Sequence, residues 1–153
     1  MSLMMGLLTS LCALAQDDIN LEKYRAQSVK KWEQAITRLE ALDQSEKHPD
    51  HSILFIGSSS IRRWDEIAAD MAPYHPIRRG FGGSRWSDVA IFADRLIKPH
   101  KFRALVCFVG NDITGAKNDK SPEEVVALFV CVWKKARAHQ PDAPIFYLSL
   151  IHI

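Results

Sequence analysis

The chain has 153 residues, of which 47% are hydrophobic and 25% charged, the composition of one ordinary globular domain. Twenty Lys and Arg side chains against 18 Asp and Glu give a formal net charge of +2. No run of like charge is long enough to follow a phosphate backbone. The composition therefore does not favour a disordered chain and argues against nucleic acid as a partner.

The first 15 residues, MSLMMGLLTSLCALA, carry no charge and end on Ala-Leu-Ala, a small-x-small sequence typical of signal-peptidase sites. The stretch is too short to span a bilayer. Because no Lys or Arg precedes it, an apolar N-terminus that frays is the alternative. We predict a signal peptide over residues 1–15, hence a secreted or periplasmic protein with no stable membrane anchor after cleavage.

The spacing of apolar residues indicates the first elements. Between residues 21 and 42 it follows the helical period with charges between, so residues 16–50 are interpreted as an N-terminal helix and loop. The unbroken apolar run 53–56 is typical of a parallel strand covered on both faces. After three serines, residues 61–71 are predicted to form a helix that ends before Pro73.

Strands and helices continue to alternate down the chain. A weak strand is predicted near Ile77, followed by a glycine turn and a helix over residues 87–97. The fully apolar run 104–109 predicts a second buried strand, and residues 143–153 predict a last one.

The helix before that last strand has the clearest boundaries. Ser121 is its expected N-cap, Pro122 occupies the first helical position, and Glu124 completes a capping box. The helix is expected to end near His139, before Pro141.

This order of elements predicts an α/β fold, in which residues 51–153 form an open, mostly parallel sheet with helices on both faces. Ligands of such sheets bind outside the carboxyl ends of the strands. Three loops of unusual composition, 57–60, 80–84 and 110–114, follow strand ends. We therefore expect them to meet at one edge of the sheet.

The remaining candidates for metal or disulfide chemistry carry no pattern. Cys107 and Cys131 are placed as small core residues rather than as a disulfide, and the histidines lack metal-ligand spacing. We predict no metal and no cofactor. The sequence gives no basis for an oligomeric state.

Each of the three loops offers a group suited to acyl transfer. A serine on a tight strand-to-helix turn exposes its hydroxyl above the sheet, near the unpaired N–H groups of a helix N-terminus. The loop GFGGS lets backbone approach a ligand, and Asn111 carries an amide donor that Asp112 can brace. The alternatives are a simple helix cap, a phosphate cradle and ordinary turns. Together the loops match what a tetrahedral intermediate requires.

The stretches FIGSSSIRRW, RRGFGGSRWSDV and VGNDI resemble the first three blocks of the SGNH hydrolases, also called GDSL-like lipases and esterases. The similarity runs from about residue 52 to residue 150, in the branch whose first motif reads Gly-Ser-Ser-Ser-Ile. It implies a flavodoxin-like three-layer α/β/α sandwich. It also implies a carboxylic ester hydrolase acting on a small ester, such as an acetylated carbohydrate or a short acyl lipid, through an acyl-serine intermediate.

Carried onto this chain, the resemblance makes Ser59 the nucleophile. The backbone N–H groups of Ser59 and Gly83 and the side chain of Asn111 become the oxyanion hole. Arg62 and Trp64 match the branch motif and are expected to brace the nucleophile helix. Arg85 and Trp86 follow the glycine loop and are candidates to line the acyl or sugar side of the pocket. The alternative is that Trp86 packs the start of the next helix.

The sequence departs from the family pattern at three points. Ser58 stands where the Gly-Asp-Ser motif has aspartate, and Gly110 directly precedes Asn111 where one residue usually lies between them. No Asp-x-x-His, the block that supplies the general base and its partner, occurs in the chain, and His152 does not match it.

The missing block defines two expectations. The domain is predicted to be C-terminally incomplete and inactive as it stands, with one face of the sheet under-covered. The alternative function is a non-catalytic binding module that holds a phosphate or sugar at the sheet edge.

Overall fold

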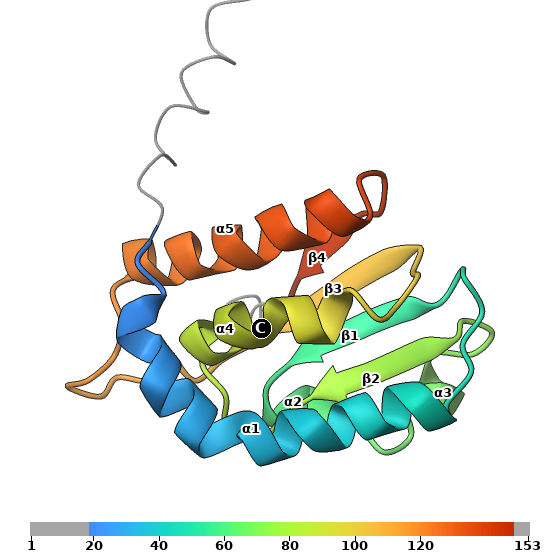
Figure 1. Ribbon diagram of the computed structural model, residues 1–153, viewed down its shortest axis with the longest axis horizontal. Helices are drawn as coiled ribbons and strands as arrows, with labels where there is room; N and C mark the ends of the chain where they lie inside the picture. The colour runs from blue at the N-terminus through green and yellow to red at the C-terminus, as the bar shows by residue number, and fades with distance from the viewer. Residues whose placement is uncertain (1–18, 149–153) are drawn as a thin grey trace, which may run out of the picture.

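The computed structural model describes residues 19–148, so the predicted signal peptide and residues 149–153 lie outside the described part of the chain. Helices and strands alternate after a long first helix (Figure 1). The elements are α1 (Glu22–Ser45), β1 (Ile53–Gly57), α2 (Ser59–Arg62), α3 (Ile67–Asp70), β2 (Pro76–Gly80), α4 (Trp86–Ile97), β3 (Ala104–Phe108), α5 (Pro122–His139) and β4 (Ile145–Tyr147).

The strands form one sheet in the order β2-β1-β3-β4, and every pairing is parallel. Gly57, the last residue of β1, is in register with Gly80 at the end of β2 and with Phe108 at the end of β3. Three neighbouring strands therefore end at one level, and their arrowheads point to the same side in Figure 1. The predicted α/β class is confirmed, with a sheet that is wholly parallel over the described residues.

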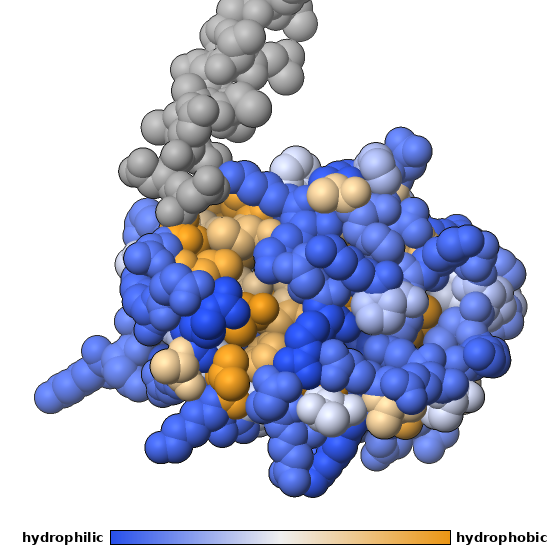
Figure 2. Space-filling model, viewed as in Figure 1, coloured by the Kyte–Doolittle hydropathy of each residue, from blue (hydrophilic) through white to orange (hydrophobic). Residues whose placement is uncertain are grey.

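Helices cover both faces of this sheet, which gives three layers (Figure 1). On one face α4 lies between α1 and α5, and ten of its twelve residues are buried. Its apolar side chains Val89, Phe92, Ala93 and Leu96 are at most 2% exposed. Figure 2 shows this side as mostly hydrophilic, with apolar side chains gathered over α4 between α1 and α5.

The second helical layer is thinner than predicted, because residues 61–71 form two one-turn helices, α2 and α3, rather than one helix. The break lies at Trp64, whose carbonyl oxygen accepts a hydrogen bond of 2.9 Å from Arg78 Nη1. Its indole packs edge-on against Phe55 of β1, with 5.7 Å between ring centroids. These contacts anchor Trp64 to the sheet, and they turn the chain out of the helix.

The sheet face that carries α2 and α3 loses its cover toward β4. Phe55, Val106 and Phe146 lie side by side across the strands in this row. Phe55 is 2% exposed and Phe146 is 52% exposed. An under-covered face was predicted, and among the described residues it is the β4 side of this one.

Two boundary details differ from the sequence prediction. α1 continues three residues beyond the predicted end, to Ser45. The Ser121 N-cap is confirmed by a 3.2 Å hydrogen bond from the Glu124 backbone N–H. The Glu124 carboxylate, however, accepts hydrogen bonds from Tyr24 and Lys23 of α1 instead of closing a capping box. The acidic side chain thus ties α5 to α1.

The two described cysteines are both free, as predicted. Cys107 is fully buried in β3, and burial raises the pKa of its thiol well above the ordinary range, which leaves it unreactive. Between residues 19 and 148, no helix combines the length and apolar character needed to cross a bilayer.

Candidate active site

The three loops singled out in the sequence leave the sheet at the same edge and are joined by backbone hydrogen bonds. The Ser58 N–H donates to the Phe108 carbonyl at 2.9 Å, which ties the serine loop to β3. The Phe81 N–H donates to the Gly57 carbonyl at 2.9 Å, which ties the glycine loop to β1. We call this side of the sheet the carboxyl edge.

The serine loop depends on the glycine that precedes it. Gly57 has φ = +142°, and a Cβ atom there would lie 2.0 Å from the Phe108 carbonyl oxygen. Only a residue without a side chain lets β1 turn this close to β3. The turn places Ser58 at the N-cap position of α2 and Ser59 at its first helical position.

The serines do not act as a side-chain cap. Ser58 makes no side-chain capping hydrogen bond. Ser59 is partly exposed, and no hydrogen bond joins its hydroxyl to another residue between 19 and 148. The helix that follows has only four residues, so the unpaired N–H groups expected near Ser59 belong to a single helical turn. The Ser59 hydroxyl is therefore available to a ligand.

The glycine loop lies against the serine loop. The Ser84 hydroxyl donates to the Gly57 carbonyl at 3.3 Å, in addition to the Phe81 hydrogen bond. Gly83 is exposed with φ = +73°, a left-handed conformation that favours glycine. Trp32 of α1 lies beneath it, 3.7 Å from where a Cβ atom would be.

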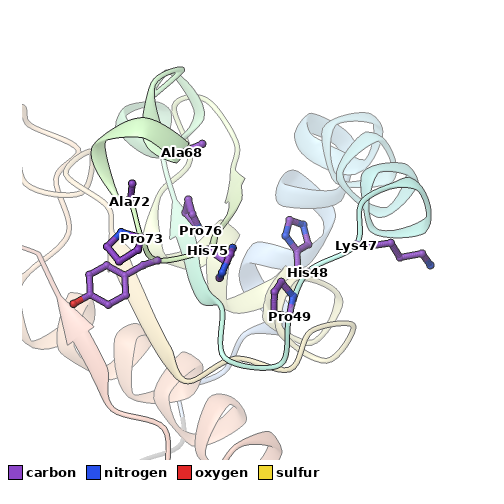
Figure 3. A pocket seen from close by; sticks show the side chains of 9 residues that line it. Lys47, His48, Pro49, Ala68, Ala72, Pro73, His75 and Pro76 are labelled. Carbon is purple, nitrogen blue, oxygen red and sulfur yellow. The ribbon is translucent and has the colours of Figure 1, made fainter.

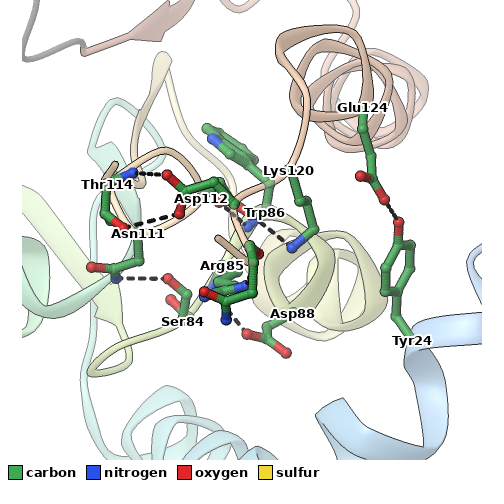
Figure 4. Close-up of polar contacts among 12 residues, drawn as sticks. Tyr24, Ser84, Arg85, Trp86, Asp88, Asn111, Asp112, Thr114, Lys120 and Glu124 are labelled. Atoms are coloured by element: carbon green, nitrogen blue, oxygen red, sulfur yellow. Dashed lines mark hydrogen bonds and ion pairs between the residues drawn. The ribbon is translucent and has the colours of Figure 1, made fainter. Parts of the chain in front are cut away.

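The third predicted residue, Asn111, contacts the glycine loop directly. Its Nδ2 atom donates to the Ser84 carbonyl at 2.9 Å (Figure 4). An amide nitrogen carries two hydrogens, so one donor remains for a ligand. Contact with the glycine loop is kept although Gly110 precedes Asn111 without the usual intervening residue.

Asp112 anchors this loop, as its position after Asn111 indicated, and it does so with a partner that the sequence did not reveal. Its Oδ2 atom accepts the Trp86 backbone N–H at 2.8 Å, at the start of α4. Its Oδ1 atom lies 2.9 Å from Lys120 Nζ, and both side chains are at most 10% exposed. Figure 4 shows the ion pair and the Trp86 contact together. The buried pair holds the Asn111 loop on the helix that follows the glycine loop.

Trp86 itself packs the start of α4 rather than lining a pocket. It is fully buried, with its ring 5.3 Å from Phe129 of α5 and 5.6 Å from Tyr147 of β4. Arg85 remains partly exposed beside the loop, and its backbone N–H donates to Asp88 at 2.9 Å.

The described histidines lie at the opposite edge, where the strands begin. His75 directly precedes β2, its carbonyl accepts the first N–H of β1, and its ring packs edge-on against His51. His100 lies between α4 and β3, and its carbonyl is 2.7 Å from Nε2 of His139. His48 packs against His100, with 6.5 Å between ring centroids. Within residues 19–148, no imidazole is positioned to deprotonate Ser59.

A pocket of about 390 Å³ opens at this amino edge (Figure 3). Its lining includes His48, His75 and Tyr74, together with three prolines. No group of three or more His, Cys, Asp or Glu side chains in the described part of the chain is arranged to hold a metal ion. The pocket lies at the edge where the strands begin, whereas the three loops lie at the edge where they end.

Comparisons with known proteins find similar solved structures but no similar sequence. No protein-family profile matches the chain, and no curated protein is significantly similar to it. A solved structure from Streptococcus pneumoniae, described provisionally as a platelet activating factor, is similar with a TM-score of 0.64 and 17% identity over 94% of this chain. A GDSL-like lipase from Bacteroides thetaiotaomicron has a TM-score of 0.59 and 13% identity over 73% of this chain.

The matched regions cover 61% and 56% of those two proteins, so the chain spans less than two thirds of their length. At these identities the likeness concerns the fold. The three-layer parallel α/β architecture expected from the three motifs is confirmed, and the chain is similar in fold to a GDSL-like lipase.

Proposed function

We propose that the chain is an SGNH-type carboxylic ester hydrolase in which Ser59 attacks the ester carbonyl. The hydrogen bonds that join the three loops at the carboxyl edge carry this proposal. They hold a free hydroxyl, an exposed glycine N–H and an amide donor on neighbouring strand ends. Preorganised donors of this kind stabilise the negative oxygen of a tetrahedral intermediate.

In the proposed reaction the Ser59 oxygen bonds to the carbonyl carbon, and the carbonyl oxygen becomes negative. The backbone N–H groups of Ser59 and Gly83 and the free Nδ2 hydrogen of Asn111 donate to that oxygen. The alcohol leaves, and water then cleaves the acyl-serine. The substrate is a small ester, such as an acetylated carbohydrate or a short acyl lipid. The uncharged residues 1–15 support export of the protein.

The Ser59 proton requires a base, and residues 19–148 bring no imidazole to the carboxyl edge. A hydroxyl without a base is a weak nucleophile. We therefore expect this chain by itself to hydrolyse esters very slowly. The same observation favours a second candidate function, a binding module whose loops hold a sugar or an anion without chemistry.

A fluorophosphonate probe separates the two candidates, because it bonds covalently to a nucleophilic serine. We expect a single adduct that forms slowly in the absence of a base, located at Ser59 by peptide mapping. Adding about 100 mM imidazole supplies the missing base and should accelerate labelling about tenfold or more, given that general bases contribute about 10²–10⁴ in rate.

Matched variants complete the experiment. Ser59→Ala should abolish the adduct, and Ser60→Ala, which removes the next hydroxyl along the helix, should keep it. An adduct that survives Ser59→Ala contradicts the assignment of the nucleophile. No adduct with or without imidazole, in a protein that circular dichroism shows to be folded, favours the binding module.

A further inference from the structure

The guanidinium group of Arg62 lies on the glycine loop. A Cβ atom on Gly82 would be 2.6 Å from Arg62 Nε and 3.1 Å from its Cζ and Nη2 atoms. A side chain at position 82 would therefore displace the arginine, and glycine leaves room for it. The branch motif predicted that Arg62 braces the nucleophile helix, whereas its guanidinium contacts the glycine loop.

This contact places a positive charge beside the proposed oxyanion hole. Arg62 is the last residue of α2, three positions after Ser59. Gly82, on which its guanidinium lies, directly precedes the exposed Gly83. The Arg62 side chain is itself exposed to solvent, so a ligand can reach it.

The charge of Arg62 is not neutralised by a carboxylate in the part of the chain that the structure describes. Arg78, Arg79 and Arg95 each lie within 2.8 Å of a carboxylate oxygen. Arg62 makes no ion pair with any residue between 19 and 148.

The carboxylates near the loops already have other partners. Asp112 pairs with Lys120 and with the Trp86 N–H, and Asp88 accepts from Ser28 and from the Arg85 N–H. Neither of these two carboxylates is therefore left to pair with the guanidinium.

We propose that Arg62 binds an anionic group of the substrate, so that the site prefers esters carrying a carboxylate or a phosphate close to the scissile bond. A guanidinium presents several N–H donors in one plane and matches the paired oxygens of either group. The preference for an ester rests on the proposed function, whereas the anion contact itself needs no chemistry.

The test uses three amides that share one ring and are not hydrolysed as esters are. 4-Acetamidobenzoate and 4-acetamidophenyl phosphate are anionic, and 4-acetamidobenzamide is neutral. We expect calorimetric titration of the full chain to give about tenfold tighter binding of at least one anionic compound, as charge-assisted hydrogen bonds provide. The advantage should shrink between 50 and 500 mM NaCl because the site is exposed. The two anionic arms show whether carboxylate or phosphate is preferred.

Arg62→Gln removes the charge and should bring all three affinities within about twofold of one another. The matched control is Arg103→Gln, the same change at an exposed arginine just before β3, on the opposite edge of the sheet. It should leave the preference intact. Circular dichroism verifies that both variants are folded.

Three results overturn the proposal: anionic compounds that bind no tighter than the neutral one or not at all at millimolar concentration, a preference that survives Arg62→Gln, or one lost equally in Arg103→Gln. Ser59→Ala should keep the charge preference while losing fluorophosphonate labelling. A failure of the proposed nucleophile therefore changes the labelling, and a failure of the proposed anion contact changes the binding preference.

Discussion

The two edges of the sheet carry different chemistry. At the carboxyl edge the groups that can meet a ligand are a hydroxyl, backbone N–H groups, one amide and the Arg62 cation. At the amino edge lie the described histidines and the open pocket. The proposed nucleophile and every described imidazole are separated by the length of the strands, roughly 16 Å for five residues. A serine site with its base at that distance cannot transfer a proton directly.

The edges also differ in what holds them in place. The carboxyl edge is fixed by backbone contacts between strand ends, through the Gly57 carbonyl and the Ser58 and Phe81 N–H groups. The C-terminal end of α1, which lies beside His100 at the amino edge, is fixed by charged side chains. Arg79 is 1% exposed and pairs with Asp43 at 2.6 Å and with Glu46 at 2.8 Å. Substitutions at the carboxyl edge should therefore act through steric overlap, and substitutions at the C-terminal end of α1 should act through charge.

The largest effect is expected from Gly57→Ala. The new Cβ atom would overlap the Phe108 carbonyl oxygen, and φ = +142° is strained for alanine. We expect a loss of about 4 kcal/mol or more of unfolding free energy, enough to prevent folding of a marginal domain. Urea denaturation followed by circular dichroism measures it.

Gly115→Ala is the control for that prediction. Gly115 also has positive φ, +87°, but no atom lies within 4 Å of where its Cβ atom would be. The change should cost about 1 kcal/mol from backbone strain alone. Equal losses in the two variants would show that strain, rather than the close approach of β1 to β3, dominates at the carboxyl edge.

This part of the molecule was accessible from the sequence. Apolar runs defined the buried strands, and parallel strands must bring their carboxyl ends together, so the convergence of the three loops followed from topology. The break at Trp64 did not follow, because it depends on Arg78 from a strand that comes later in the chain. The ion pair between Lys120 and Asp112 was also missed, because a loop brings the two residues together and leaves no periodic pattern in the sequence.

The next largest effect is expected from Arg79→Met. Removing the guanidinium leaves Asp43, whose side chain is 12% exposed, without its cationic partner in a poorly hydrated site. Breaking a buried ion pair from one side costs about 3 kcal/mol or more. The double variant Arg79→Met/Asp43→Leu removes both charges and should recover a large part of the loss. Equal stability of single and double variants, measured by urea denaturation, would contradict a charge-based anchor.

Arg79 also marks where sequence reasoning failed. Two consecutive arginines in a short strand give no indication of which one is buried. Strand alternation places Arg78 on the α2 and α3 face and Arg79 on the α1 face, but only the position of α1 decides that the second is enclosed. Long-range helix packing therefore determines the burial of this charge, and local pattern does not.

A smaller, pH-dependent effect is expected from His100, which lies beside the same ion pairs. Burial lowers its pKa to about 4, with Arg79 and His48 acting in the same direction and Asp43 and Glu46 opposing them. Its Nε2 atom lies 3.2 Å from Asp43 Oδ1 without hydrogen-bond alignment. The folded protein therefore binds a proton here less readily than the unfolded chain does.

The sign of the pH dependence follows from that difference. Since the unfolded histidine titrates near 6.5, the stability contribution is complete above that pH and is lost as the pH falls toward 4. At pH 5 the loss relative to pH 8 is about 2 kcal/mol. His100→Asn should flatten this slope in urea denaturation measured from pH 8 to pH 5, whereas His51→Asn, at an exposed ring on the same edge, should not. A slope unchanged by His100→Asn would show that the buried His100 ring is not the source of the acid sensitivity between pH 8 and pH 5.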